Sequence, residues 1–182
     1  MCNVLLVTCN SDTSSTKLRH AACDAIATIG RIDRNYSLRE RHLYEGAVPE
    51  GCDARGKGKD KACIDLMLQE VRVADVLVIA APIDNGRLPP ELSAWVAKLG
   101  LSARLPTRDV QDAPHKVAIM IADRTGEIES DEGRLAELCE ALRNLLAPLG
   151  ISDVAVFEAD AEGYPIRHAP LLLIVSRSSA IH

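Results

Sequence analysis

The chain has 182 residues, of which 47% are hydrophobic and 26% charged, and it carries a formal net charge of −5. This composition excludes a disordered chain and fits one domain over residues 1–182. The negative charge argues against nucleic acid or a membrane as the main partner. The sequence shows no secretory signal, no apolar run of ~20 residues, and no C-x-x-C pair among its six cysteines. We therefore expect a cytoplasmic protein with reduced thiols and no metal site.

The first half of the chain alternates between apolar strands and amphipathic helices. Residues 4–8 predict a buried strand, and apolar residues at helical spacing predict a helix that ends at Gly30. A strand interrupted by charges is expected over residues 31–38. Glycines and a basic run predict a loop over residues 39–61, and a helix is expected over residues 64–73.

The second half repeats the alternation. The apolar run 76–81 predicts a buried strand that breaks at Pro82, and a helix over 91–99 is expected to end at Gly100. Residues 116–122 predict another strand, followed by a turn over 123–126. A leucine-rich helix over 132–149, stopped by Gly150, and a strand over 151–157 complete the pattern. The segment 169–176 fits either a closing helix or an added strand.

Strands that are apolar throughout and alternate with helices are typical of a parallel sheet covered on both faces. Five such units predict a three-layer α/β fold of the flavodoxin-like kind. The expected sheet is five-stranded and parallel, in the order 2-1-3-4-5, with helices on both faces. In this topology the loops after the first, third and fourth strands meet at the carboxyl edge, where open α/β sheets bind ligands.

The loop after the first strand contains Thr13, Ser14, Ser15 and Thr16 before a predicted helix. Hydroxyls and free backbone N–H groups at a helix N-terminus suit a phosphate, and the position after the first strand favours this reading. The alternative is an ordinary helix cap. Cys9, at the end of that strand, is read as a packed thiol, and the alternative is a nucleophile near a helix N-terminus.

The other two loops contain turn residues beside charged groups. Asn85 and Gly86 can expose backbone groups to a ligand or form a plain tight turn. Asp84 could ionise beside such a site or bind local N–H groups. In the third loop, Arg124 and Gly126 offer a guanidinium and a turn, although this loop taken alone favours an ordinary surface arginine.

Together the three loops resemble two branches of the flavodoxin-like FMN oxidoreductases. One is the NADPH-dependent FMN reductases, whose motif P-x-Y-N-G-S-I-P-x-x-L-K is matched at Pro82, Asn85, Gly86, Pro89 and Leu92. The other is the FMN-dependent NADH-azoreductase and quinone reductase family. Residues 13–15, the Asp-Arg-Thr-Gly run 123–126 and the run 150–154 are similar to motifs of that branch.

The resemblance implies FMN as cofactor, NADH or NADPH as co-substrate, and a quinone, azo compound or similar small electron acceptor. It also implies a homodimer and no catalytic side chain, because the hydride chemistry belongs to the flavin. By this resemblance residues 13–15 hold the FMN phosphate. The resemblance also places Cys9 and two short segments around the isoalloxazine ring. The first segment is Pro82, Ile83, Asp84, Asn85 and Gly86, and the second is Asp123, Arg124, Thr125 and Gly126.

Several positions depart from the family motifs. Asp84 replaces a tyrosine, Gly86 replaces the aromatic residue of azoreductases, and Asp123 and Thr125 replace a serine and a glycine. Two carboxylates near the ring would oppose the negative charge of reduced flavin, so they imply weak flavin binding or a lowered potential. The alternative is a flavin-free protein that uses Asp84 and Asp123 for acid–base chemistry, or a domain that only binds.

Overall fold

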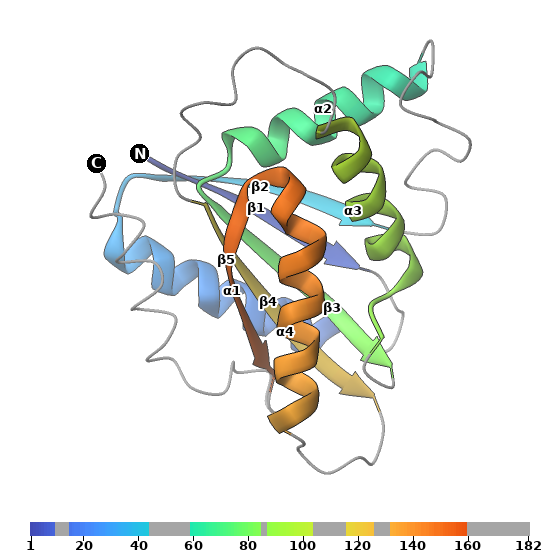
Figure 1. Ribbon diagram of the computed structural model, residues 1–182. Coiled ribbons are helices and arrows are strands. Elements are labelled where there is room, and N and C mark those ends of the chain that lie inside the picture. The colour runs from blue at the N-terminus through green and yellow to red at the C-terminus, as the bar shows by residue number, and fades with distance from the viewer. Residues whose placement is uncertain (10–14, 44–58, 85–86, 104–115, 126–131, 160–182) are drawn as a thin grey trace.

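The computed structural model describes residues 1–9, 15–43, 59–84, 87–103, 116–125 and 132–159. Five strands form one parallel sheet in the order β2-β1-β3-β4-β5 (Figure 1), which confirms the predicted class and strand order. The elements, in chain order, are β1 (Cys2–Cys9), α1 (Ser15–Ile32), β2 (Tyr36–Leu43), α2 (Lys59–Val73), β3 (Val76–Asp84), α3 (Pro90–Ala103), β4 (Lys116–Thr125), α4 (Glu132–Leu146), the short 3-10 helix η1 (Ala147–Leu149) and β5 (Ile151–Glu158).

The sheet is the middle of three layers, and a separate hydrophobic core lies on each of its faces (Figure 1). Successive residues of a strand point to opposite faces, so Leu5 and Val7 enter one core while Val4 and Leu6 enter the other. The first core packs under α2, α3 and α4, and the second packs under α1. This division explains why β1 and β3 are apolar at nearly every position.

Helix α1 runs through Gly30 to Ile32, so the prediction that Gly30 ends the helix was wrong. The glycine is needed for space, because a Cβ atom there would lie 2.7 Å from Cε1 of Tyr36. The second strand consequently starts at Tyr36 rather than at residue 31. It tolerates charges because it pairs with β1 alone in the described part of the chain, and Arg39 and Glu40 are exposed.

The predicted loop over residues 39–61 was too long at both ends, because β2 continues to Leu43 and α2 already begins at Lys59. The remainder of that loop, residues 44–58, lies outside the described residues, as does the segment 169–176. No helix in the described ranges is long and apolar enough to cross a membrane.

Three other boundaries extend past the predicted breaks. β3 passes through Pro82 to Asp84, because the ladder with β1 ends at Ala80 and the remainder of the strand pairs with β4. β4 correspondingly reaches Thr125. Helix α3 begins at Pro90 and continues through Gly100 to Ala103. At Gly100 a Cβ atom would be in ordinary contact with Pro148, at 3.8 Å.

The predicted stop at Gly150 is confirmed, with one change of geometry before it. The α-helix ends at Leu146, and η1, which contains Pro148, covers Ala147–Leu149. Gly150 has a left-handed φ of 78°, and its N–H donates to the Ala147 carbonyl at 3.0 Å. This turn reverses the chain directly into β5.

Candidate functional site

The carboxyl ends of β1, β3 and β4 lie at one edge of the sheet, as Figure 1 shows. The register aligns Thr8 of β1 with Ala80 of β3, and Ala80 with Ile121 of β4. β3 and β4 then continue together for four more residues beyond the end of the β1 ladder. The three predicted loops therefore start from neighbouring strands at the edge where such sheets bind ligands.

The first of these loops leads into the N-terminus of α1, which begins at Ser15. The first turn of α1 contains no acidic residue, so no carboxylate there offsets the positive end of the helix dipole. Thr13 and Ser14 lie outside the described residues. The first N–H groups of an α-helix have no partner within the helix, so the start of this 18-residue helix supplies the kind of donors that an FMN phosphate requires.

The second and third loops are brought together by strand pairing. Pro82 pairs with Asp123, Ile83 with Arg124, and Asp84 with Thr125. Asp123, Arg124 and Thr125 therefore continue β4, and the prediction that they form a turn was wrong. The side chain of Ile83 is buried in the core under α2, α3 and α4, and Pro82 is half-buried. Asn85, Gly86 and Gly126 lie outside the described residues.

Cys9 is a core residue rather than a reactive one. Its side chain is 5% exposed and belongs to the core under α2, α3 and α4. Burial, with a smaller contribution from the charge of Glu91, raises the pKa of the Cys9 thiol to about 12. The thiolate is the nucleophilic form, so the nucleophile hypothesis was wrong. Any contact of Cys9 with a ligand at this edge would have to come from its backbone.

Glu91 is a charged residue of this edge that the sequence reasoning missed. It is half-buried in the first turn of α3, and its charge acts on the Cys9 thiol at the end of β1. The signal in the sequence was an acidic residue directly after Pro89 and Pro90. That position is typical of a helix first turn, where the dipole stabilises a carboxylate.

His42 is the second residue that was missed, because the five histidines are dispersed in the sequence. It lies at the carboxyl end of β2, where its Nδ1 is 2.5 Å from the Thr8 hydroxyl oxygen of β1. Its Nε2 is 3.8 Å from a Glu40 carboxylate oxygen. Among the described residues, no group of three or more His, Cys, Asp or Glu side chains could hold a metal ion.

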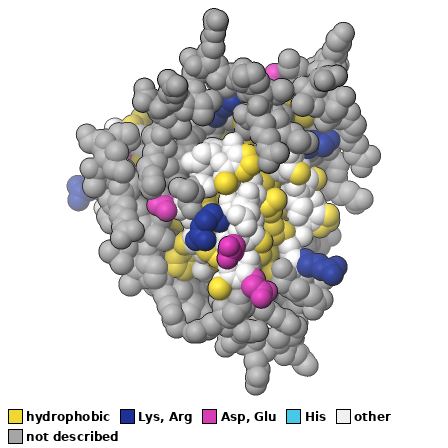
Figure 2. Space-filling view, in the orientation of Figure 1, with side chains coloured by type: hydrophobic (Ala, Val, Ile, Leu, Met, Phe, Trp, Pro, Cys, Tyr) yellow, Lys and Arg dark blue, Asp and Glu magenta, His cyan; other side chains and the backbone are white. Residues whose placement is uncertain are grey.

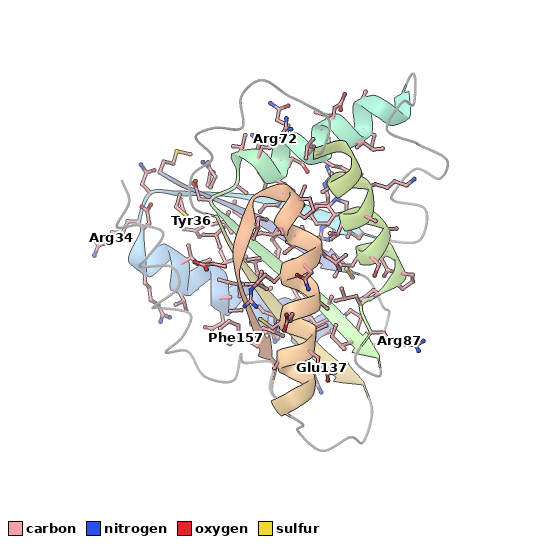
Figure 3. All side chains as sticks on the ribbon, viewed as in Figure 1. Arg34, Tyr36, Arg72, Arg87, Glu137 and Phe157 are labelled. Atoms are coloured by element: carbon pink, nitrogen blue, oxygen red, sulfur yellow. The ribbon has the colours of Figure 1, made fainter. Side chains whose placement is uncertain are left out.

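Basic and acidic side chains are interspersed on the face that Figure 2 shows, and neither sign dominates its described surface. Arg87, which follows β3 after residues 85–86, is exposed, and Figure 3 shows its side chain extending away from the sheet. Arg87 is the first described residue after the second loop, and its charged group therefore faces solvent.

Comparison with known proteins agrees with this architecture. The profile of the flavodoxin-like fold family matches residues 2–170. Two of the solved structures that align over 100% of this chain are azoreductases. An azoreductase from Bacillus anthracis str. Sterne has a TM-score of 0.62 at 17% identity, with 98% of that chain covered. An FMN-dependent NADH-azoreductase from Bacillus anthracis str. Ames Ancestor, in complex with FMN, has a TM-score of 0.64 at 14% identity, with 99% covered.

Curated relatives share more of the sequence. An FMN-dependent NADH:quinone oxidoreductase from Idiomarina loihiensis is 30% identical over 132 residues, which cover 70% of this chain and 71% of the relative. Another, from Chromobacterium violaceum, is 28% identical over 121 residues, or 64% of this chain. This match spans only 60% of the length of the Chromobacterium protein. The chain therefore belongs to the flavodoxin-like fold family, with FMN-dependent NADH:quinone oxidoreductases among its relatives.

Proposed function

We propose that the chain is an FMN-dependent NAD(P)H oxidoreductase that reduces a quinone, azo compound or similar small acceptor. The observation that carries the proposal is the strand register, which brings Pro82 beside Asp123 at the edge where β1 leads into α1. The three motif-bearing segments thus follow strands that are neighbours in the sheet. The relatives named as FMN-dependent NADH:quinone oxidoreductases support the same cofactor and acceptor class.

In this proposal each segment has one task. Thr13, Ser14 and Ser15, with the N-terminal N–H groups of α1, bind the FMN phosphate. The segments 82–86 and 123–126, with the backbone at Cys9, border the isoalloxazine ring. When bound, FMN supplies the redox chemistry, accepting hydride from NAD(P)H and returning two electrons to the acceptor. No side chain of this chain is assigned as an acid or a base, and the protonated Cys9 thiol takes no covalent part.

The experiment is to purify the chain, record its visible spectrum, and titrate FMN into any colourless fraction. We expect a flavin spectrum and oxidation of NADH or NADPH that depends on both FMN and added benzoquinone. Riboflavin in place of FMN is the matched control, because it has the same ring without the phosphate. A protein that ignores FMN at millimolar concentration would exclude this function and favour the flavin-free alternative.

We further propose a homodimer of single-domain chains, residues 1–182, in the cytoplasm. The family resemblance supports the dimer, and the reduced cysteines support the compartment. Five cysteines in the described residues are free thiols. Light scattering on the purified chain measures the assembly: a mass of twice 19.7 kDa is expected, and a single-chain mass would contradict the dimer.

A further inference from the structure

We infer that two copies of this chain meet through the outer side of α2, with the two helices antiparallel. The surface, called the α2 stripe below, consists of Asp65, Leu66, Gln69, Arg72 and Val73, all of which are exposed. The inference rests on the homodimer of the proposed function, which does not say where the chains meet. It goes further by naming the surface and the orientation of the helices.

Two large apolar side chains of the α2 stripe face solvent. Leu66 is 60% exposed and Val73 is 45% exposed. The other large apolar residues of the same helix are buried in the core: Ile64, Met67, Leu68 and Val71. Burial of Leu66 and Val73 against a second chain would remove their apolar surface from water, which favours association.

The helix repeat lines these two side chains up. Residues seven apart are separated by nearly two turns, so Leu66 and Val73 lie on one side of α2, about 10 Å apart along its axis. Gln69 lies between them. Asp65 and Arg72 are also seven residues apart, and each directly precedes one of the apolar residues. They therefore share one flank of the apolar strip, with the acid toward the start of the helix and the base toward its end.

This arrangement of charges is complementary to itself. In a two-fold symmetric dimer the same surface of each chain contacts the other. When the helices run antiparallel about the midpoint between residues 65 and 72, Asp65 lies level with Arg72 of the partner subunit, on the same flank. Symmetry forms this pair twice, and Leu66 then lies beside Val73 of the partner subunit. A parallel pair would put Asp65 level with Asp65 and Arg72 level with Arg72, so opposite charges would not meet.

The side of α2 that faces the sheet is already occupied. Nε of Arg41, on β2, donates to Oε2 of Glu70 at 2.6 Å, and both side chains are half-buried. Glu70 is therefore neutralised within its own chain. Among the charged side chains of α2 that the structure describes, Asp65 and Arg72 are the exposed ones, and Figure 3 shows Arg72 on the outer side of the helix. These two charges are the ones that a second chain would meet.

The first test places a charge in the centre of the α2 stripe. Sedimentation equilibrium of the purified full-length chain over a range of concentrations gives the dissociation constant of the dimer. Leu66→Glu should raise this constant at least about tenfold, because the dimer would bury two carboxylates without partners. Ala136→Glu adds the same charge at an exposed position of α4 and is the matched control that should leave the constant unchanged. Far-UV circular dichroism checks that both variants are folded.

The second test exchanges the charges, because exposed ion pairs contribute too little for simple removal to be informative. Asp65→Arg or Arg72→Asp alone puts like charges level with each other at two places in the dimer. Each should raise the dissociation constant by about threefold or more. The double variant Asp65→Arg with Arg72→Asp restores opposite charges only in the antiparallel arrangement, and its dissociation constant should return toward that of wild type.

Three results would overturn the inference: a wild-type chain that stays monomeric, a dimer that Leu66→Glu does not weaken, and a double variant no tighter than the single ones. Titration of FMN into the same samples tests the proposed oxidoreductase separately. A monomer that binds FMN refutes the α2 interface and leaves the flavin chemistry intact. A dimer that responds to these variants but ignores FMN refutes the flavin chemistry and leaves the interface intact.

Discussion

Asn3 and Asp75 hold the starts of β1 and β3 together at the edge opposite the proposed site. The backbone N–H and the side-chain amide of Asn3 both donate to Oδ2 of Asp75, at 2.8 and 3.2 Å. The Asp75 N–H donates back to the Asn3 carbonyl at 2.8 Å. Ser37 extends the network to β2, because its hydroxyl donates to Oδ1 of Asn3 at 2.8 Å.

The first prediction concerns this network. Asp75→Ala leaves two donors of Asn3 without their acceptor, and an unsatisfied half-buried donor costs about 1–3 kcal/mol. We expect the free energy of unfolding in urea to fall by that amount with an unchanged m-value. Asp65→Ala removes an exposed carboxylate from α2 and should change it by less than about 0.5 kcal/mol. Equal losses in the two variants would mean that the network contributes nothing.

The second prediction concerns Trp95, the single tryptophan of the chain. Its side chain is fully buried in the core under α2, α3 and α4, and its Nε1–H has no hydrogen-bond partner in the described part of the structure. Trp95→Ala should lower the free energy of unfolding by about 3–5 kcal/mol, because it leaves a large cavity.

Trp95→Phe keeps most of the packing and also removes the unpartnered donor. We therefore expect it to cost less than about 2 kcal/mol, since the lost volume is partly offset by removing a buried polar group. Urea unfolding followed by far-UV circular dichroism measures both variants without using tryptophan emission. If phenylalanine proves as costly as alanine, Nε1–H has a partner that matters.

The third prediction is a pH dependence of stability that arises from Cys9. The pKa of this thiol is raised from 9.0 to about 12 in the folded chain. Between these values the unfolded chain binds fewer protons than the folded one, so stability decreases as pH rises. The stabilisation that comes from the raised pKa of Cys9 is fully present below pH 9. Above pH 9 the free energy of unfolding falls by up to about 1.4 kcal/mol per pH unit.

The measurement is the free energy of unfolding of wild type and Cys9→Ala between pH 8 and 10.5. Cys9→Ala should be less stable at pH 8, because a buried side chain is truncated, yet should lose less stability as pH rises. The difference between the two curves isolates Cys9 from other groups that titrate in this range, including Cys2, whose pKa is raised to about 11 chiefly by burial. If the free energies of unfolding of wild type and Cys9→Ala changed in parallel with pH, Cys9 would not be the source of the pH dependence.

The class and strand order could be predicted because β1 and β3 are buried on both faces and are therefore apolar throughout. The boundaries could not be predicted, because Gly30, Pro82 and Gly100 are local breakers whose effect is overridden by packing. Gly30 makes room for the ring of Tyr36, and Pro82 lies beyond the β1–β3 ladder. Such contacts join residues that sequence periodicity does not connect.

Part of the candidate site could also be predicted from the sequence, and part of it could not. The meeting of the loops after β1, β3 and β4 follows from topology alone, so it could be predicted once the strand order was expected. The burial of Cys9 and its proximity to Glu91 depend on how α3 packs beside the end of β1. The short contact of Thr8 with His42 likewise depends on the register of two strands that are 34 residues apart in the chain.

The last prediction separates the two interpretations of the loop before α1. Ser14→Glu places a carboxylate at the start of that helix. If this loop binds the FMN phosphate, charge repulsion should raise the dissociation constant of FMN at least tenfold, while that of riboflavin, which has no phosphate, changes less than about twofold.

Stability should respond in the opposite direction. A negative charge at a helix N-terminus is stabilising, so the free energy of unfolding should stay level or rise by up to about 1 kcal/mol. Ala62→Glu adds the same charge on the exposed side of α2 and should alter neither flavin affinity. An unchanged FMN affinity in a folded Ser14→Glu variant would assign these hydroxyls to helix capping and move the phosphate elsewhere. A parallel loss of riboflavin affinity would instead place the flavin ring, rather than its phosphate, beside the start of α1.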